Sequence, residues 1–269
     1  MIARSTEVRW SGVLLIVVLL GLWEGTSRAG LVYTVYMPPI TRIAAAWGEL
    51  IASGELPRAL GISLYHAALG YAFALVLALP LGVLIGFYRA LFSLFEPLIE
   101  LLRPLPPPAV IPLAILFLGI GDAMKVFMIA FACFFPMLVS SAHAVRNVET
   151  GLIDAARALG FGDVPILRYI VAPLAAPAVA AGARISLAIA LILTIIAEMV
   201  AGNNGLGFVI LDAQRSFRVP EMYAGIFTLA CLGYALNCLF AWLERRVLAW
   251  HPGWRGTEEP YPTYLANSH

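Results

Sequence analysis

Charged residues are scarce in this chain. Only 12% of its 269 residues are Asp, Glu, Lys or Arg, whereas 61% are hydrophobic and the mean hydropathy is +0.89. Soluble domains carry roughly 25% charged and roughly 45–50% apolar residues. A soluble fold of this length would leave much of that apolar surface in water. The composition therefore excludes an ordinary soluble domain and predicts an integral membrane protein.

Lysine, cysteine and histidine are also rare. The formal net charge is +1 and Lys125 is the single lysine, so no basic surface for nucleic acid is expected. The three cysteines lie in apolar runs, which favours buried packing over disulfides or metal ligands. The histidines show no metal-ligand spacing and are interpreted as structural or solvated; they are His66, His143, His251 and His269. We therefore expect no metal and no cofactor on this chain.

The chain lacks the residue patterns of an ATPase or of a membrane-embedded enzyme. Lys125 follows Gly-Asp-Ala-Met and not a phosphate-binding loop, so ATP chemistry would have to come from a partner. The apolar runs contain no paired acids, no His–Glu motif and no nucleophile beside a base. The sequence therefore predicts a protein that is not an enzyme.

Six apolar runs have the length of membrane helices, which need about 20 mostly apolar residues. They are roughly Trp10–Ser27, Leu60–Phe87, Leu98–Leu118, Met124–Ala144, Ala176–Ala197 and Tyr223–Leu243. They predict an all-α, polytopic membrane protein. The first run follows Arg4 and Arg9 and is interpreted as an uncleaved span; the alternative is a signal peptide cut near Ser27-Arg28-Ala29.

Basic residues predict the orientation of these spans. An even number of spans places both termini on one side, and if that side is the cytoplasm, ten basic residues are cytoplasmic and six are external, with Arg103 unassigned. The ten are Arg4, Arg9, Arg89, Arg146, Arg157, Arg168, Arg184, Arg245, Arg246 and Arg255; the six are Arg28, Arg42, Arg58, Lys125, Arg215 and Arg218. Because cytoplasmic loops are enriched in Lys and Arg, we expect both termini in the cytoplasm.

Two further segments are interrupted by helix breakers. Met37–Pro57 opens with two prolines and then has apolar residues at helical spacing, which predicts an amphipathic helix lying on the membrane surface. These residues are Ile43, Ala46, Trp47 and Leu50. Gly202–Pro220 contains glycines and two asparagines and is interpreted as a re-entrant or surface-lying segment.

Ionisable residues inside membrane spans usually mark a pathway, and few occur here. His66 lies inside the second span, and Glu198 lies at the outer end of the fifth. Glu198, with Asn204 and Gly205, is a candidate for the translocation path or an outer gate. An equally good interpretation is that Glu198 pairs with nearby backbone or an arginine and fixes the loop. The prolines of 104–112 bend their helix, either to widen a cavity or, as we favour, as a packing kink.

The longest polar interruption runs from Arg146 to about Pro173. A first short helix is expected to start at Glu149 or Thr150 and to end before Gly160, where a left-handed cap is expected. A second, Val164–Val171, is expected to be capped by Asp163 and ended by Pro173. The product is a helix–turn–helix with small and apolar side chains on one face. It suits docking into another protein, although an ordinary helical connection fits the same residues.

Within this interruption, residues 154–173 resemble a motif of ABC importer permeases. The motif is commonly written E-A-A-x3-G-x9-I-x-L-P, and the chain matches it at Ala155, Ala156, Gly160, Ile170 and Pro173. Asp154 replaces the glutamate on a shorter stem, and Ala172 replaces the leucine. The chain is therefore identified as resembling the membrane-spanning permease subunit of such importers. The resemblance implies that Asp154 and the five matching residues form the contact with an ATPase.

Other stretches are similar to the nitrate, sulfonate and taurine group of these permeases. They are Leu102–Leu113, Gly119-Ile120-Gly121, Ala197-Glu198-Met199, Asn204–Gly207 and Leu243–Arg246. The resemblance implies a bacterial inner-membrane permease, working as a homodimer with two cytoplasmic ATPase subunits and a periplasmic or lipid-anchored binding protein. It further implies a type-1 transmembrane domain at 59–247 with a coupling segment at 149–173. An N-terminal span and amphipathic segment (1–58) would precede the domain, and a cytoplasmic tail (248–269) would follow it. ATP and Mg would bind the partner ATPase.

The sequence defines the transported substrate less well than it defines the type of transport complex. The resemblance implies a small anion such as a sulfonate, taurine or nitrate, with a vitamin precursor as the alternative. A secondary transporter is a further alternative, but such proteins usually place ion-binding acids near the middle of the membrane. This chain has almost none there.

Overall fold

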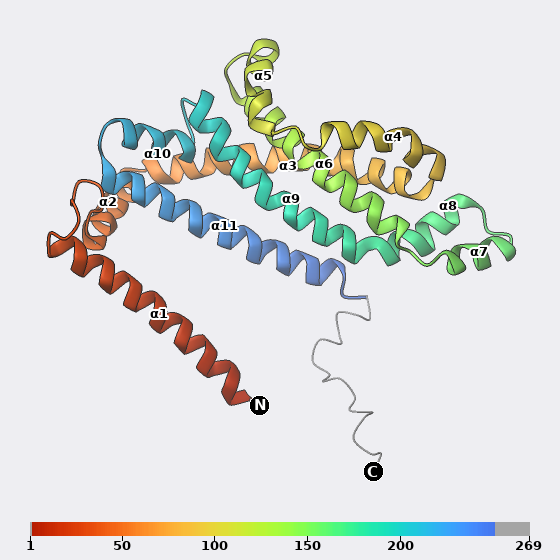
Figure 1. Cartoon of the computed structure of the whole chain (residues 1–269), viewed down its shortest axis with the longest axis horizontal. Helices are drawn as coiled ribbons and strands as arrows, with labels where there is room; N and C mark the ends of the chain where they lie inside the picture. Colours follow the sequence, from red (N-terminus) through yellow and green to blue (C-terminus); the bar gives the residue numbers. More distant parts are fainter. Residues whose placement is uncertain (1, 251–269) are drawn as a thin grey trace. The chain divides into compact units, whose positions relative to one another are not determined.

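The structure is a computed structural model that describes residues 2–250, with the side chains of residue 12 and residues 14–250. All regular secondary structure in this range is helical (Figure 1). The elements are α1 (Ile2–Arg28), α2 (Ile40–Ala52), α3 (Glu55–Phe87), α4 (Arg89–Leu102), a 3-10 turn (Pro107–Val110), α5 (Ile111–Leu118), α6 (Asp122–Arg146), α7 (Thr150–Ala158), α8 (Asp163–Ile166), a π turn (Leu167–Val171), α9 (Ala172–Ala201), α10 (Leu206–Arg215) and α11 (Val219–Val247). This confirms the predicted all-α fold.

The chain forms two units, and four helices contribute to both. The first unit comprises the residues up to Ala74 together with Leu105–Cys133 and Ile189–Gly233. The second comprises Leu75–Pro104, Phe134–Ala188 and the residues from Tyr234. Helices α3, α6, α9 and α11 each begin in one unit and end in the other.

Within the described part of the chain, four helices are long and apolar enough to cross a membrane. They are Glu55–Phe87, Asp122–Arg146, Asp163–Ala201 and Val219–Val247. Large apolar side chains on α3 are exposed, among them Phe73 at 55% and Val76 at 65%, as expected for a helix that faces lipid. Glycines let α3 approach α6 in both units: a Cβ at Gly70 would lie 2.6 Å from Ile129, and one at Gly82 would lie 2.6 Å from the carbonyl oxygen of Leu138.

The predicted third span, Leu98–Leu118, is not one continuous helix, and the bend predicted at the prolines of 104–112 is confirmed. Helix α4 starts earlier, at Arg89, and ends at Leu102; a 3-10 turn and the eight-residue α5 follow. The pair crosses a membrane only as a bent span, or forms a re-entrant loop. The cause is local, because consecutive prolines at 106–108 lack backbone N–H donors and disfavour helix in the preceding residue.

Helix α2 confirms the predicted amphipathic helix within Met37–Pro57, and its apolar face lies against protein. Leu50 is buried and Ile43 and Trp47 are partly buried, in a core that includes Leu206 and Ala224. The indole of Trp47 donates a hydrogen bond to the hydroxyl of Thr228 on α11 at 3.0 Å. A 3.6-residue apolar period serves a protein contact as well as a lipid surface, so the sequence alone could not assign the neighbour.

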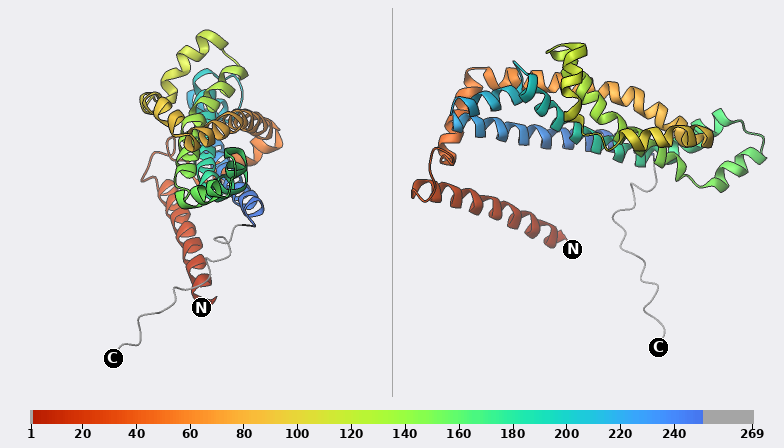
Figure 2. Two further views of the ribbon diagram at one scale, coloured as in Figure 1. Left: turned by 90° about the vertical axis from the view of Figure 1, so that its right-hand side faces the viewer. Right: turned by 45° about the horizontal axis from the view of Figure 1, so that its top comes forward.

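Helix α1 contains the first predicted span. It meets α2 near its C-terminal end (Figure 2). There the indole of Trp23 donates to the carbonyl oxygen of Pro38 at 3.0 Å, and Ser27 donates to that of Met37 at 2.7 Å. Apolar side chains from Leu14 to Leu22 are 46–65% exposed, a surface that requires lipid or another protein. Most of the predicted tail, 251–269, lies outside the described residues.

Candidate functional site

Helices α7 and α8 build the predicted helix–turn–helix in the second unit. The turn after α7 has the hydrogen bonds of a Schellman cap: the N–H of Gly160 donates to the carbonyl of Arg157 at 2.9 Å, and that of Phe161 donates to Ala156 at 3.1 Å. Gly160 has φ of +84°, which confirms the predicted left-handed residue. The path of the chain between the two helices therefore depends on one glycine.

The inner face of this segment anchors it to the end of α6. Ala156, Ile166 and Val171 are buried in one core with Val145 and Val148. Of the motif residues, Ala156 belongs to this core and Ile170 packs against it while half-buried. These two positions therefore hold the segment in place.

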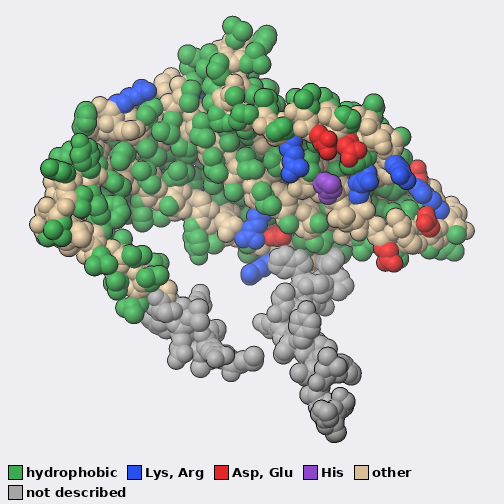
Figure 3. All heavy atoms as spheres, in the orientation of Figure 1, with side chains coloured by type: hydrophobic (Ala, Val, Ile, Leu, Met, Phe, Trp, Pro, Cys, Tyr) green, Lys and Arg blue, Asp and Glu red, His purple; other side chains and the backbone are tan. Residues whose placement is uncertain are grey.

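The outer face exposes apolar side chains among charges. Leu159 is 78% exposed, Phe161 54% and Val164 72%. Asp154 and Ala155 are also exposed, and Arg157 pairs with Asp163 across the turn at 3.3 Å. Charged side chains gather over α7 and α8 in Figure 3. Carboxylates and guanidinium groups exclude this segment from lipid, so its exposed apolar side chains lie outside the membrane.

The second short helix differs from its prediction. Gly162, and not Asp163, is the N-cap of α8, and Pro173 does not end the helix. The chain continues through the π turn Leu167–Val171 into α9, which gives one apolar helix from Asp163 to Ala201. A π turn inserts one extra residue and displaces the carbonyls that a following proline would meet, so Pro173 is accommodated in the first turn of α9.

A buried polar cluster centred on Glu198 lies in the first unit. The carboxylate is fully buried, and its Oε2 accepts hydrogen bonds from the Ser63 hydroxyl at 2.7 Å and the Gly207 N–H at 3.0 Å. Ser63 also accepts from the N–H of Leu206 at 2.8 Å. Leu206 and Gly207 are the first two residues of α10, so the carboxylate lies where a helix favours a negative charge. Glu198 therefore ties α3 and α9 to the start of α10.

His66 and Lys125 extend the cluster to the start of α6. His66 is fully buried; its Nδ1 lies 3.0 Å from Oε1 of Glu198, and its Nε2 lies 3.0 Å from Oδ1 of Asp122 outside hydrogen-bond geometry. The buried ammonium of Lys125 donates to Asp122 at 3.3 Å and to Oδ1 of Asn204 at 2.5 Å. Asp122 is exposed, whereas Glu198 and Lys125 are fully buried, and each of these two buried groups has polar partners, as buried charges require.

Glycines enclose the Glu198 side chain. A Cβ on Gly205 would lie 2.3 Å from the carboxyl carbon of Glu198, and one on Gly207 would lie 2.8 Å from its Cβ. Gly205 also has φ of +94° and ψ of 172°, a conformation found almost only in glycine. The sequence Gly-Asn-Asn-Gly-Leu-Gly at 202–207 is thus a backbone cradle for one buried acid, as well as a helix break.

The structure brings Glu198, Asn204 and Gly205 together as the sequence suggested, and adds partners that the sequence did not identify. From the sequence alone His66 is interpreted as structural or solvated, and no role in a site follows for Ser63, Asp122 or Lys125. Two signals were present: Ser63 and His66, like Asp122 and Lys125, are three residues apart and so share a helix face. Nothing in the sequence placed those faces beside Glu198.

Residues 78–249 match the family described as binding-protein-dependent transport system inner membrane component. The chain is 33% identical over 245 residues to a putative aliphatic sulfonates transport permease protein of Bacillus subtilis, covering 91% of this chain and 89% of that one. It is 30% identical over 241 residues to the taurine transport system permease protein of Escherichia coli, covering 87% of each. Among solved structures, an inward-facing MetNI methionine ABC transporter is similar with a TM-score of 0.58 at 21% identity. That match covers 70% of this chain and 92% of that one.

Proposed function

This chain belongs to the family of inner membrane components of binding-protein-dependent transport systems, and on that premise we propose that it forms the translocation path for a small organic anion. It is a permease of an ABC importer. The observation that carries the anion is the similarity, over nearly the whole chain, to permeases named for aliphatic sulfonates and for taurine. The anion would be delivered by a substrate-binding protein and moved at the expense of ATP hydrolysed on other chains.

The α7–α8 segment is the proposed contact with an ATPase subunit. Its inner face is fixed by Ala156 and Ile170, while Leu159 and Phe161 remain exposed. Each copy of the chain offers one such surface, so a transporter with two ATPase subunits requires two permease subunits, either two copies of this chain or this chain with a second, different permease. Of these we propose the homodimer, to be checked by the mass of the purified complex; a single copy per complex would contradict it.

The cluster around Glu198 is proposed to latch the outer end of the path. Its hydrogen bonds hold the segment 202–207, which directly follows the last residue of α9, against α3. The hydrogen-bond partners of the Glu198 carboxylate are protein groups, which suits it to holding a gate segment. Its negative charge makes it less suited to binding a transported anion.

Uptake by the reconstituted machine tests the transport function. The chain would be purified with its ATPase and binding protein and reconstituted in proteoliposomes, and uptake of labelled taurine and ethanesulfonate would be measured with and without ATP. We expect ATP-dependent uptake of at least one. A purified chain that hydrolyses ATP without a partner, or uptake driven only by an ion gradient, would contradict the proposal.

Cysteine labelling from outside sealed cells tests the orientation, with the exposed Cys231 and Cys238 first replaced by alanine. We propose that both termini are cytoplasmic, which places Ser53 outside and Gly162 inside. A membrane-impermeant maleimide is then expected to modify a cysteine at position 53 and not one at position 162. Labelling at 162 in sealed cells would overturn the orientation.

A further inference from the structure

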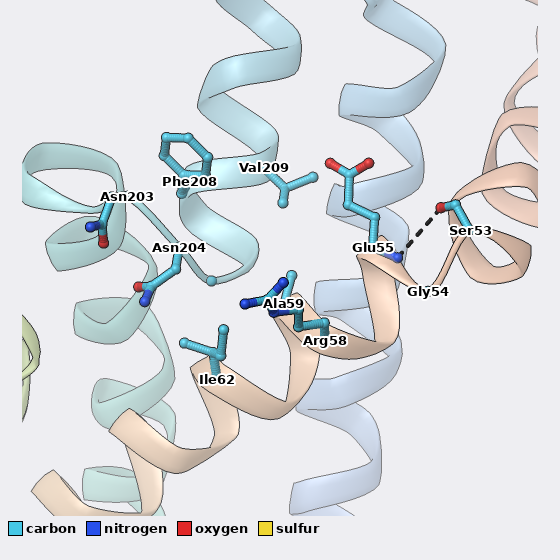
Figure 4. A pocket seen from close by; sticks show the side chains of 11 residues that line it. Ser53, Gly54, Glu55, Arg58, Ala59, Ile62, Asn203, Asn204, Phe208 and Val209 are labelled. Atoms are coloured by element: carbon cyan, nitrogen blue, oxygen red, sulfur yellow. Dashed lines mark hydrogen bonds between the residues drawn. The ribbon is translucent and has the colours of Figure 1, made fainter.

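A cavity of about 480 Å³ opens in the first unit beside the Glu198 cluster. It lies between the start of α3 and the loop that leads into α10 (Figure 4). Its polar lining includes the side chains of Arg58, Asn203 and Asn204, and its apolar lining includes Ile62 and Val209. Asn204 therefore both lines the cavity and belongs to the buried cluster.

Arg58 supplies an unpaired positive charge. Among the described residues no carboxylate lies within ion-pair distance of its guanidinium group, although Glu55 lines the same cavity. Figure 4 shows the guanidinium directed toward Asn204, while the Glu55 carboxylate lies on the other side of the cavity. The five N–H donors of this planar group match the oxygens of a sulfonate or carboxylate.

Asn204 is oriented by its contact with Lys125. An ammonium only donates hydrogen bonds, so the oxygen of the Asn204 side chain must face it, at 2.5 Å. The amide NH2 is then the part that remains for another acceptor. Arg58 from α3 and Asn204 from the 202–205 loop thus line one cavity, and the side chain of Asn204 is held in place by a buried lysine.

The remaining lining restricts the ligand further. Ile62 and Val209 offer apolar surface to a short carbon chain. Glu55 offsets part of the positive charge and disfavours a second negative charge on the ligand. We propose that this cavity is a subsite for a small organic monoanion, whose charged head binds Arg58 and the amide of Asn204 and whose short tail contacts Ile62 and Val209. The inference rests on the proposed function, because it places the class of substrate at one end of the path.

Protection of Arg58 from phenylglyoxal tests the subsite without any transport. The purified chain in lipid nanodiscs would be modified in sodium ethanesulfonate or in sodium chloride at equal ionic strength. The rates at single arginines would be followed by mass spectrometry. We expect ethanesulfonate to slow modification of Arg58 at least fivefold. Arg42 is the internal control, because it is exposed on α2 and does not line the cavity; its rate should change less than twofold.

Asn204→Asp provides the matched variant. The carboxylate keeps an oxygen for Lys125 but removes the NH2 donor and adds a negative charge, so the ethanesulfonate concentration for half-protection should rise at least tenfold. Equal slowing of Arg58 and Arg42, or undiminished protection in Asn204→Asp, would overturn the subsite. Protection without ATP-driven uptake would leave the subsite standing and refute the proposed function; uptake without protection would do the reverse.

Discussion

The α7–α8 turn is held by contacts between residues close together in the sequence, whereas the Glu198 cluster is held by contacts between residues far apart in the sequence. The turn is local: its cap bonds join residues three to five positions apart, and its exposed side chains are presented by one glycine. The cluster is long-range: Glu198 is hydrogen-bonded to Ser63 and His66, which lie 135 and 132 positions away. Both use glycines with positive φ, Gly160 in open space and Gly205 pressed against a carboxylate.

The two regions are therefore sensitive to different kinds of substitution. A surface turn can be strained without exposing a buried charge, so damage there should remain local and affect docking. A buried charge cluster in a membrane protein has no water to replace a lost partner. Damage there should spread to the stability of the first unit.

Removal of the Glu198 carboxylate is expected to have the largest effect. Glu198→Ala leaves the buried His66 and the N–H of Gly207 without their partner, and such losses cost about 3–5 kcal/mol in the free energy of unfolding. At roughly 2–4 °C per kcal/mol, the melting temperature in detergent should fall by about 10 °C. Glu198→Gln keeps one acceptor oxygen and should lose less.

Glu49→Ala is the control for this comparison, because Glu49 is exposed on α2. Its melting temperature should stay near that of the wild type. If Glu198→Ala melts no lower than Glu49→Ala, the cluster does not hold the first unit together, and the latch proposed for 202–207 has no energetic basis.

Alanine at the two positive-φ glycines separates strain from crowding. Both substitutions incur backbone strain, about 1–2 kcal/mol for a left-handed residue and about 1–3 kcal/mol for the glycine-only region of Gly205. Only Gly205→Ala also places a Cβ 2.3 Å from the Glu198 carboxyl group. A Cβ added at Gly160 would have no atom of another part of the chain within 4 Å. Gly205→Ala should therefore lower the melting temperature more than Gly160→Ala. Equal losses would mean that the cradle relaxes and that the crowding is harmless.

The sequence predicted local features well where the cause was local. The cap at Gly160, the helix after Glu149 and the amphipathic period of α2 each depend on neighbours within a few residues. The prolines predicted the bend of the third span for the same local reason, but the apolar run did not indicate that its first helix begins as early as Arg89. The end of the helix at Pro173 was wrong because a π turn can accommodate a proline that usually marks an end.

The candidate site was predictable only in part. Glu198, Asn204 and Gly205 are close in sequence and were grouped for that reason. His66 and Lys125 reach the same place from α3 and α6, and an amphipathic or apolar pattern does not state which helix faces which. A lone histidine in an apolar run is as compatible with ordinary packing as with a charge cluster, so its partner could not be assigned without the packing of the helices.

Substitution of Gly160 should cost the least stability and still abolish docking. A β-branched residue at φ of +84° is strained by about 1–2 kcal/mol or more, and the chain can relieve that strain by reorienting α8. Because Leu159 and Phe161 flank the glycine, reorientation displaces the exposed apolar surface, whereas Val145 and Val148 keep the inner face anchored. Gly160→Val should therefore insert at wild-type abundance, melt close to wild type, and fail to retain its ATPase on copurification.

Gly162→Val adds the same bulk two residues away, at an extended φ of −77° that valine accepts, and should retain the ATPase. Full ATPase recovery with Gly160→Val would show that α7–α8 is only a connection, and equal loss in both variants would show that bulk, not the turn, disrupts the contact.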